Sequence, residues 1–137
     1  MRSTRFLIAT VAAVCICAVP AQVRAFERWS VIDGDTILYA NVDGRAMMTE
    51  TIGLLEVDAP DLQGACESER VKAAAARELT AHRLLAAKVI EVDRVGRLYR
   101  FGRTLARVLL DGVPLSSILL QAGLARPYLG ERRHGWC

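Results

Sequence analysis

The sequence lacks the short motifs that mark several large enzyme classes. It has no G-x-S-x-G serine-nucleophile motif, no phosphate-binding P-loop and no glycine-rich dinucleotide fingerprint. It also lacks internal repeats, low-complexity tracts and an interdomain linker, which predicts a single domain. Aromatic residues make up only 6% of the 137 residues, but hydrophobic residues make up 53%, which is enough to fill one core and excludes disorder as the general state.

The N-terminal segment differs in composition from the rest of the chain. Two arginines precede a charge-free apolar stretch from Phe6 to Ala21, and a small-x-Ala pattern ends at Ala25. This layout is typical of a secretory signal peptide, although the apolar run is nearly long enough for an uncleaved membrane anchor. Pro20 favours cleavage after Ala25. We therefore expect a secreted or periplasmic domain, residues 26–137, with no stable membrane association after cleavage.

The expected mature chain has no excess charge of either sign. Removing residues 1–25 takes away three arginines and no acid, so the balance changes from 18 basic and 15 acidic residues to 15 of each. A net charge of zero provides no global attraction to a polyanion. Any argument for nucleic-acid binding therefore has to rest on local groups.

Only two cysteines remain in that mature chain, Cys66 and Cys137. An even pair in an exported chain usually forms a disulfide, which here ties the C-terminus to the middle of the chain, within one monomer or between two. The alternative is a metal site formed by the two cysteines and His134, but it lacks a fourth convincing ligand. The disulfide is the favoured interpretation.

Hydrophobic alternation and turn signals predict a three-strand meander at the start of the domain. Strands are expected around residues 29–32 and 37–39, and a third, at 46–57, follows an Asp-Gly hairpin signal at residues 43–44. The third strand is expected to end at the proline of the segment 58–60. In such a meander, the turn after the first strand and the turn after the third strand can lie at the same end.

The second half of the domain alternates between helical and strand patterns. We expect a helix at 67–88, strands at 89–92 and 104–110, and a short helix at 115–122 that is closed by Gly123. The residues that mark the apolar face of the first helix are Val71, Ala74, Ala75, Leu79, His82 and Leu85. His82 is expected to be packed or exposed rather than a ligand. Five strands with a helix after the third predict a small β-barrel with helices, of the OB-like α+β class.

Two acidic turns flank the meander. Asp33 and Asp35 stand at the first turn, and Asp58 and Asp61 stand where the third strand ends. Ordinary turn chemistry explains each pair alone, because aspartate commonly starts a reverse turn. Together they suggest that Asp35 and Asp58 converge at one end of the barrel, where carboxylate oxygens suit Ca²⁺ or Mg²⁺.

The segment 94–103 is rich in arginine and has two aromatic residues among its cations. These residues are Arg94, Arg97, Tyr99, Arg100, Phe101 and Arg103. Such a segment can bind phosphates through guanidinium groups and stack its aromatic rings on bases. The alternative is a solvated hairpin that carries its arginines on the exposed side.

Several segments resemble the sequence blocks of the staphylococcal nuclease-like (thermonuclease) family. They are VIDGDTI at 31–37, LLEVDAP at 54–60, FGRTLARV at 101–108 and GLARPY at 123–128. The ending RRHGWC at 132–137, together with Cys66, resembles exported bacterial members. The resemblance covers most of residues 29–137, in order and with sensible spacing.

The resemblance implies a five-stranded OB-fold barrel and Ca²⁺-dependent cleavage of DNA or RNA, with Mg²⁺ as the other candidate metal. The implied calcium ligands are Asp35, Asp58 and the carbonyl of Ala59, and the implied catalytic residues are Arg103, on the phosphate, and Asp61, beside the attacking water. We also expect Arg100 and Tyr128 to contact the substrate, which is single-stranded DNA or RNA bound by a monomer.

Four positions depart from the family pattern. Gly53 stands where a second phosphate-binding arginine is usual, Asp61 replaces glutamate, Glu56 replaces glycine or an apolar residue, and Tyr99 replaces an acid. Losing one such phosphate donor commonly costs about 100- to 1000-fold in rate. We therefore expect weakened nuclease activity. The alternatives are a catalytically degenerate OB module that binds nucleic acid or a protein, and a structural role in the cell envelope.

Overall fold

A computed structural model describes residues 26–42, 47–98 and 102–137 of the chain. Its elements, in chain order, are β1 (Phe26–Asp33), β2 (Thr36–Val42), β3 (Met47–Leu54), β4 (Val57–Asp58), α1 (Glu67–Ala86), β5 (Ile90–Leu98), β6 (Arg103–Leu110), β7 (Val113–Pro114), α2 (Leu115–Gln121) and β8 (Arg126–Pro127). The expected signal peptide, the Asp-Gly hairpin signal at 43–44, and the residues Tyr99, Arg100 and Phe101 lie outside the described residues.

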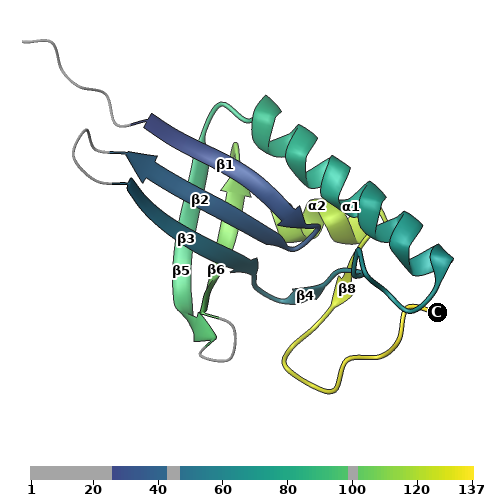
Figure 1. Cartoon of the computed structure of the whole chain (residues 1–137). Helices are drawn as coiled ribbons and strands as arrows, with labels where there is room; N and C mark the ends of the chain where they lie inside the picture. Colours follow the sequence, from purple (N-terminus) through teal and green to yellow (C-terminus); the bar gives the residue numbers. More distant parts are fainter. Residues whose placement is uncertain (1–25, 43–46, 99–101) are drawn as a thin grey trace, which may run out of the picture.

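The main sheet is mixed and has the strand order β1-β2-β3-β6-β5. The first three strands form the predicted antiparallel meander, and β5 pairs antiparallel with β6. The two parts join through parallel pairing of β3 with β6, from Ile52 opposite Thr104 to Leu54 opposite Ala106. Figure 1 shows β5 and β6 crossing behind the meander. This arrangement, with α1 inserted before β5, confirms the predicted OB-type α+β class.

The third strand ends earlier than the sequence pattern predicted. It stops at Leu54, and the chain turns at Leu55 and Glu56 before the two-residue strand β4, which pairs with β8. Glu56 adopts a φ of 70°, in the left-handed region that normally favours glycine. The prediction of one strand at 46–57 was wrong. The turn has no glycine to mark it in the sequence, because Glu56 takes the left-handed conformation instead.

Strand β5 is longer than predicted and takes in part of the arginine-rich segment. It runs to Leu98, with a shift of register between Arg94 and Gly96. Arg94 forms an ion pair with Glu50 of β3 at 2.7 Å. The prediction of a loop directly after residue 92 was wrong, because arginines fit a strand whose outer face is exposed and has an acidic neighbour.

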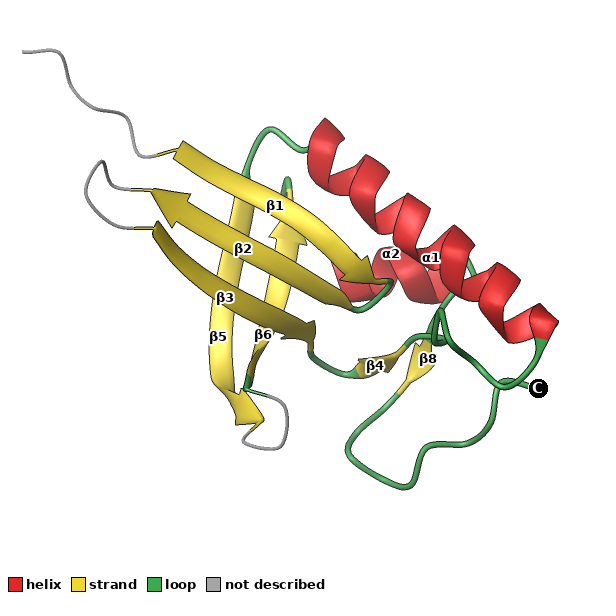
Figure 2. Cartoon of the chain, viewed as in Figure 1, coloured by secondary structure: helices red, strands yellow, loops and turns green. Residues whose placement is uncertain are grey.

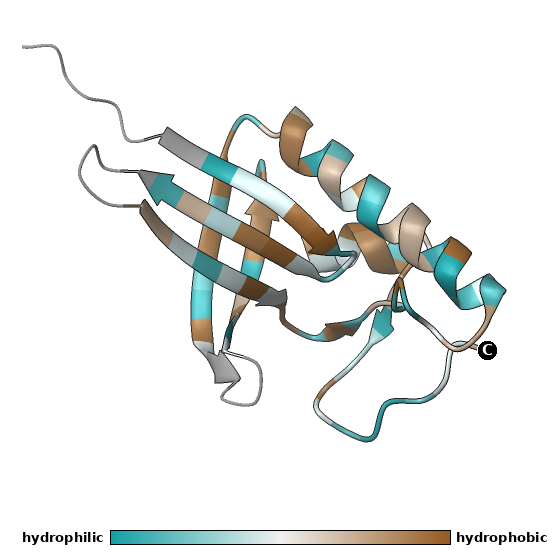
Figure 3. Ribbon diagram, viewed as in Figure 1, coloured by the Kyte–Doolittle hydropathy of each residue, from teal (hydrophilic) through white to brown (hydrophobic). Residues whose placement is uncertain are grey.

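Helix α1 buries a different face from the one that its apolar pattern marked. Its buried residues are Glu69, Ala73, Ala76, Thr80 and Leu84. The side chains of Val71 and Leu85 are instead 62% and 88% exposed, and His82 is also exposed. Figure 3 shows hydrophobic and hydrophilic residues alternating along this helix. The helix lies along β1 (Figure 2), and close approach to the backbone at Gly34 requires a small side chain at Ala76.

The core lies between the sheet and the two helices. Ile37 and Ile52 from the meander and Leu115 and Leu119 from α2 are fully buried. Helix α2 ends as predicted, because Gly123 follows it with a φ of 67°. Within the described residues, no helix combines the length and apolar character needed to span a membrane.

A disulfide joins Cys66, immediately before α1, to Cys137 at the C-terminus, with 5.9 Å between the Cα atoms. This confirms the predicted pairing within one chain. The thiolate metal site considered as the alternative is excluded here, because the two sulfur atoms are bonded to each other. The bridge brings the last residues of the chain back to the start of α1 (Figure 1).

Candidate active site

The turn between β1 and β2 is held against α1 by a close approach. A Cβ atom on Gly34 would lie 2.6 Å from the Cβ atom of Ala76, so only glycine fits without movement. The carbonyl of Gly34 accepts a hydrogen bond from the buried hydroxyl of Thr80 at 2.8 Å. Helix α1 therefore determines where Asp33 and Asp35, the residues on either side of Gly34, are placed.

Asp35 connects this turn to the end of β4. Its Oδ2 accepts a hydrogen bond from the N–H of Ala59 at 3.0 Å, and its Oδ1 accepts one from the hydroxyl of Thr36 at 3.0 Å. The backbone carbonyl of Asp35 also accepts the N–H of Leu54 at 2.8 Å. These bonds bring Asp35 beside the Asp58–Ala59 peptide, as the sequence predicted for the two acidic turns.

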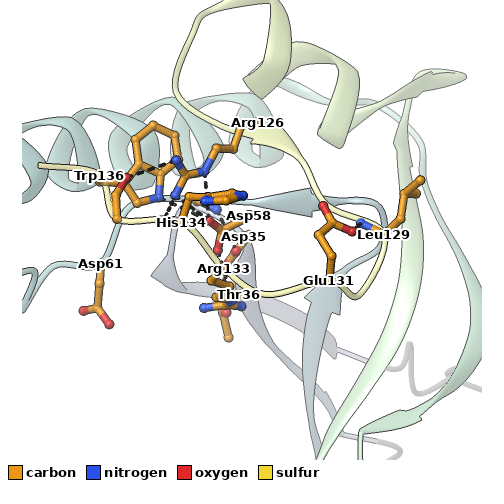
Figure 4. Close-up of polar contacts among 12 residues, drawn as sticks. Asp35, Thr36, Asp58, Asp61, Arg126, Leu129, Glu131, Arg133, His134 and Trp136 are labelled. Carbon is orange, nitrogen blue, oxygen red and sulfur yellow. Dashed lines mark hydrogen bonds and ion pairs between the residues drawn. The ribbon is translucent and has the colours of Figure 1, made fainter.

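Asp58 is a buried carboxylate with three cationic or polar partners, all from the C-terminal segment. Its side chain is 4% exposed. Arg126 donates from Nε and Nη2 to Oδ2, both at 3.2 Å, and the indole N–H of Trp136 donates to the same oxygen at 3.2 Å. Nε of Arg133 forms an ion pair with Oδ1 at 3.1 Å. Figure 4 shows these side chains gathered around Asp58.

Arg103 approaches the same site from the first residue of β6. It is partly buried, and its Nη1 donates to the hydroxyl oxygen of Thr36 at 3.0 Å. Thr36 in turn donates to Asp35. One hydroxyl group therefore links the predicted phosphate-binding arginine to a predicted cation ligand.

Burial and neighbouring charges shift the pKa of Asp33 in the turn. Burial, and then the charges of Asp61 and Asp35, raise the pKa of Asp33, while Arg103 and Arg77 act in the opposite direction. These interactions place Asp61 within electrostatic reach of the turn. Figure 4 nevertheless shows Asp61 standing apart from the cluster around Asp58.

A sequence model of the family described as staphylococcal nuclease homologue matches residues 51–134, more than half of the chain. The chain belongs to this family. The matched region contains Asp58, Asp61 and Arg103, and it begins after the turn that carries Asp35. No curated protein matches the chain.

This staphylococcal nuclease homologue brings together most of the predicted site residues. Asp35, Asp58, Ala59 and Arg103 form one connected group through the contacts described above. Arg100 falls outside the described residues. Arg94, which belongs to the same arginine-rich segment as Arg103, forms an ion pair with Glu50 instead. This fits the alternative interpretation of that segment, a solvated hairpin with its arginines on the exposed side.

Tyr128 lies beside the site and contacts the C-terminal segment. Its N–H donates to the carbonyl of Glu56 at 2.9 Å, and the guanidinium of Arg133 lies 5.5 Å from its ring centroid. A ring in this place can meet a base or a sugar, and it also helps to orient Arg133.

Asp61 occupies a turn that Glu69 supports. Oδ1 of Asp61 accepts the N–H of Gln63 at 2.7 Å. The buried carboxylate of Glu69 accepts the N–H groups of Asp61, at 3.4 Å, and Ala65, at 3.0 Å. The loop that carries Asp61 is therefore anchored to the first turn of α1.

Gly53 lies on β3 opposite Thr36, next to the group that links Arg103 and Asp35. A Cβ atom at this position would meet only Leu105 Cδ2, at an ordinary distance of 3.7 Å. Packing of the first side-chain atom therefore does not require glycine here.

Sequence reasoning missed Arg126, Arg133 and Trp136 as partners of Asp58. The signal was present, because the family-like segments at 123–128 and 132–137 contain one and two arginines, respectively. No spacing rule relates residues about 70 positions apart, so their convergence on one carboxylate emerges only from the fold.

Proposed function

We propose that this protein hydrolyses phosphodiester bonds in DNA or RNA at the site around Asp35, Asp58 and Arg103. The observation that carries the proposal is the continuous polar path from Asp58 to Arg103, through Ala59, Asp35 and Thr36. It sets two acids that suit a cation beside a guanidinium that suits a phosphate. Attack on a phosphodiester needs both, because negative charge builds on the phosphoryl oxygens.

The proposed cofactor is Ca²⁺, with Mg²⁺ as the alternative, held by Asp35, Asp58 and the carbonyl of Ala59. This donor set fits a hard cation because every donor is oxygen. Among the described residues, Oδ1 of Asp58 accepts no hydrogen bond and forms an ion pair with Arg133, so it retains lone pairs for another partner.

The charge at the neighbouring turn also supports a cation. The pKa of Asp33 is raised by burial and by the charges of Asp61 and Asp35. Carboxylates that repel one another in this way are stabilised when a divalent ion neutralises part of their charge.

Each residue has a role that its own chemistry supports. A bound divalent cation supplies charge stabilisation to the phosphoryl oxygens. Arg103 holds and orients the phosphate with paired N–H donors, which lysine does less well. Asp61 accepts the proton of the attacking water. It is one methylene shorter than glutamate, and a displacement of about 1 Å can cost roughly 100-fold, so we expect slow turnover.

Gly53 favours a second candidate function. Without a guanidinium at this position, the domain would act as an OB-fold module that binds nucleic acid or a protein partner without cutting. The zero net charge of residues 26–137 weighs against tight nonspecific binding, because phosphate neutralisation supplies most of that affinity.

We further propose that the protein acts as a monomer exported to the periplasm or outside the cell. Residues 1–25 have the layout of a signal peptide that ends at Ala25. The disulfide between Cys66 and Cys137 supports export, because such bonds persist in oxidising compartments.

Digestion of single-stranded DNA by the purified protein, with calcium and with a chelator, tests the nuclease function. We expect calcium-dependent cutting that falls by about 100-fold or more in Asp35→Ala and in Arg103→Ala. Arg94→Ala is the matched control, because it removes an arginine that pairs with Glu50 instead of the site. Its activity should stay within about threefold of the wild type, since it removes no oxyanion-stabilising donor.

Gly53→Arg separates the two candidate functions. An arginine there starts opposite Thr36 and should increase cutting, because it restores a phosphate donor beside Arg103. Cutting by Gly53→Arg alone, with none by the wild type, would favour the degenerate binding module. If no variant cuts, the chain shares the fold of its family but not the nuclease activity.

A further inference from the structure

The C-terminal tail, residues 129–137, places a guanidinium group at the proposed cation and phosphate site. Arg133 contacts Asp58 at 3.1 Å while its own side chain remains 55% exposed. Arg133 therefore contacts the site while more than half of its side-chain surface is exposed to solvent. Arg126, the other arginine that contacts Asp58, is more enclosed, with its side chain 30% exposed.

The donors of Arg133 leave room for an anionic ligand. A guanidinium carries five N–H donors, and the contact of Arg133 with Asp58 is an ion pair through Nε. No hydrogen bond from Arg133 is found among the described residues, so its N–H donors remain in the paired geometry that suits a phosphate.

The position of Arg133 complements that of Arg103. Arg133 contacts Asp58 at one end of the polar path, and Arg103 contacts Thr36 at the other. Both guanidinium groups therefore contact the set of side chains that includes the two carboxylates that would hold a cation. A phosphate bound at these carboxylates would meet guanidinium groups from two separate segments of the chain.

The tail holds Arg133 in place through the residues that follow it. Arg126 donates to the carbonyls of His134 and Gly135, and its guanidinium stacks 4.1 Å from the centroid of the Trp136 ring. The disulfide then fixes Cys137 to Cys66. Figure 4 shows Arg126, His134 and Trp136 close together at Asp58. This fixation reduces the entropy that Arg133 loses when it binds a ligand.

We propose that Arg133 binds the substrate phosphate and supplies, from the tail, a guanidinium donor that Gly53 cannot provide. The inference rests on the proposed function, because it assigns a further substrate contact at the same site. Gly53 lies in the strand opposite Thr36, and Arg133 reaches the other end of the same path from a separate segment.

The test compares Arg133→Ala with Arg132→Ala, which removes the same charge from the neighbouring exposed residue. Three quantities are measured on a single-stranded oligonucleotide: kcat and KM for cutting with calcium, and Kd at low salt with excess chelator. Arg133→Ala should raise both KM and Kd by about 10- to 100-fold, the usual loss for a charge-assisted hydrogen bond. Arg132→Ala should change either by less than about threefold, as expected for an exposed charge.

Two more variants identify the chemistry. Arg133→Lys should lie between the wild type and Arg133→Ala, because a lysine keeps the charge but loses the paired donors. Adding Gly53→Arg to Arg133→Ala should recover most of the lost affinity. Thermal unfolding of each variant shows whether a loss of binding reflects a loss of fold.

The outcomes separate this inference from the nuclease function. Cutting by the wild type with equal effects of Arg133→Ala and Arg132→Ala overturns the inference and leaves the nuclease intact. Binding that depends on Arg133 without any cutting supports the inference and overturns the nuclease. Faster cutting, or tighter calcium binding, in Arg133→Ala makes Arg133 a competitor of the cation and overturns the inference. A wild type that neither cuts nor binds overturns both.

Discussion

Two glycines at the site, Gly34 and Gly53, differ in whether their surroundings leave space for a side chain. Gly34 touches α1 so closely that an added Cβ would lie 2.6 Å from Ala76, whereas an added Cβ at Gly53 meets only Leu105 at 3.7 Å. Gly34 is therefore required by packing, and it keeps Asp33 and Asp35 against the helix. Gly53 is a chemical difference from the family pattern rather than a structural need.

Gly34→Ala should lower the free energy of unfolding by about 1–3 kcal/mol, because the new methyl group overpacks the contact with Ala76. Urea unfolding measures the change. Gly53→Ala is the control and should stay within about 0.5 kcal/mol of the wild type. Equal stability of the two variants would mean that the turn does not rest on α1 as described.

At the scale of elements, α1 serves the site more than its apolar pattern indicates. It buries Ala76 and Thr80 against Gly34 of the β1–β2 turn and leaves Val71 exposed. The small residues allow the helix to approach the turn, and the Thr80 hydroxyl satisfies the carbonyl of Gly34 at 2.8 Å. The helix is thus a support for the acidic turn as well as a cover for the core.

Thr80→Val should lower the free energy of unfolding by about 1–3 kcal/mol, because it keeps the volume but leaves the buried Gly34 carbonyl without this donor. Chemical denaturation gives the difference. Thr49→Val, on the exposed part of β3, is the matched control and should change stability by no more than about 0.5 kcal/mol. A loss as large in the control would indicate that the hydroxyl of Thr80 has no special role.

At the scale of the whole molecule, the disulfide holds the C-terminal tail next to the proposed active site. Cys66 and Cys137 are 71 residues apart, and the loop between them contains α1, β5, β6, α2 and the tail. Cross-linking so long a loop restricts the unfolded chain. The same bond holds Trp136 and Arg133 near Asp58, so stability and site assembly depend on one covalent link.

A reducing agent should lower the free energy of unfolding by about 2–4 kcal/mol, the usual contribution of a disulfide that closes a long loop. The double variant Cys66→Ser/Cys137→Ser should show the same loss without reductant and no further change with it. Urea unfolding of both proteins, with and without reductant, checks this. If the stability of the wild type does not change with reductant, the disulfide does not contribute to the free energy of unfolding.

The sequence by itself determined the elements whose cause is local. Period and turn signals predicted the meander, both helices and the Gly123 cap, and family-like segments pointed to Asp35, Asp58 and Arg103. The tertiary structure alone decided which face of α1 is buried, where β3 ends, and which residues surround Asp58. Those features depend on groups distant in the chain: the backbone of Gly34 selects small residues on α1, and the disulfide returns Arg133 to Asp58. Local periodicity carries no information about such distant partners, so only the folded chain specifies them.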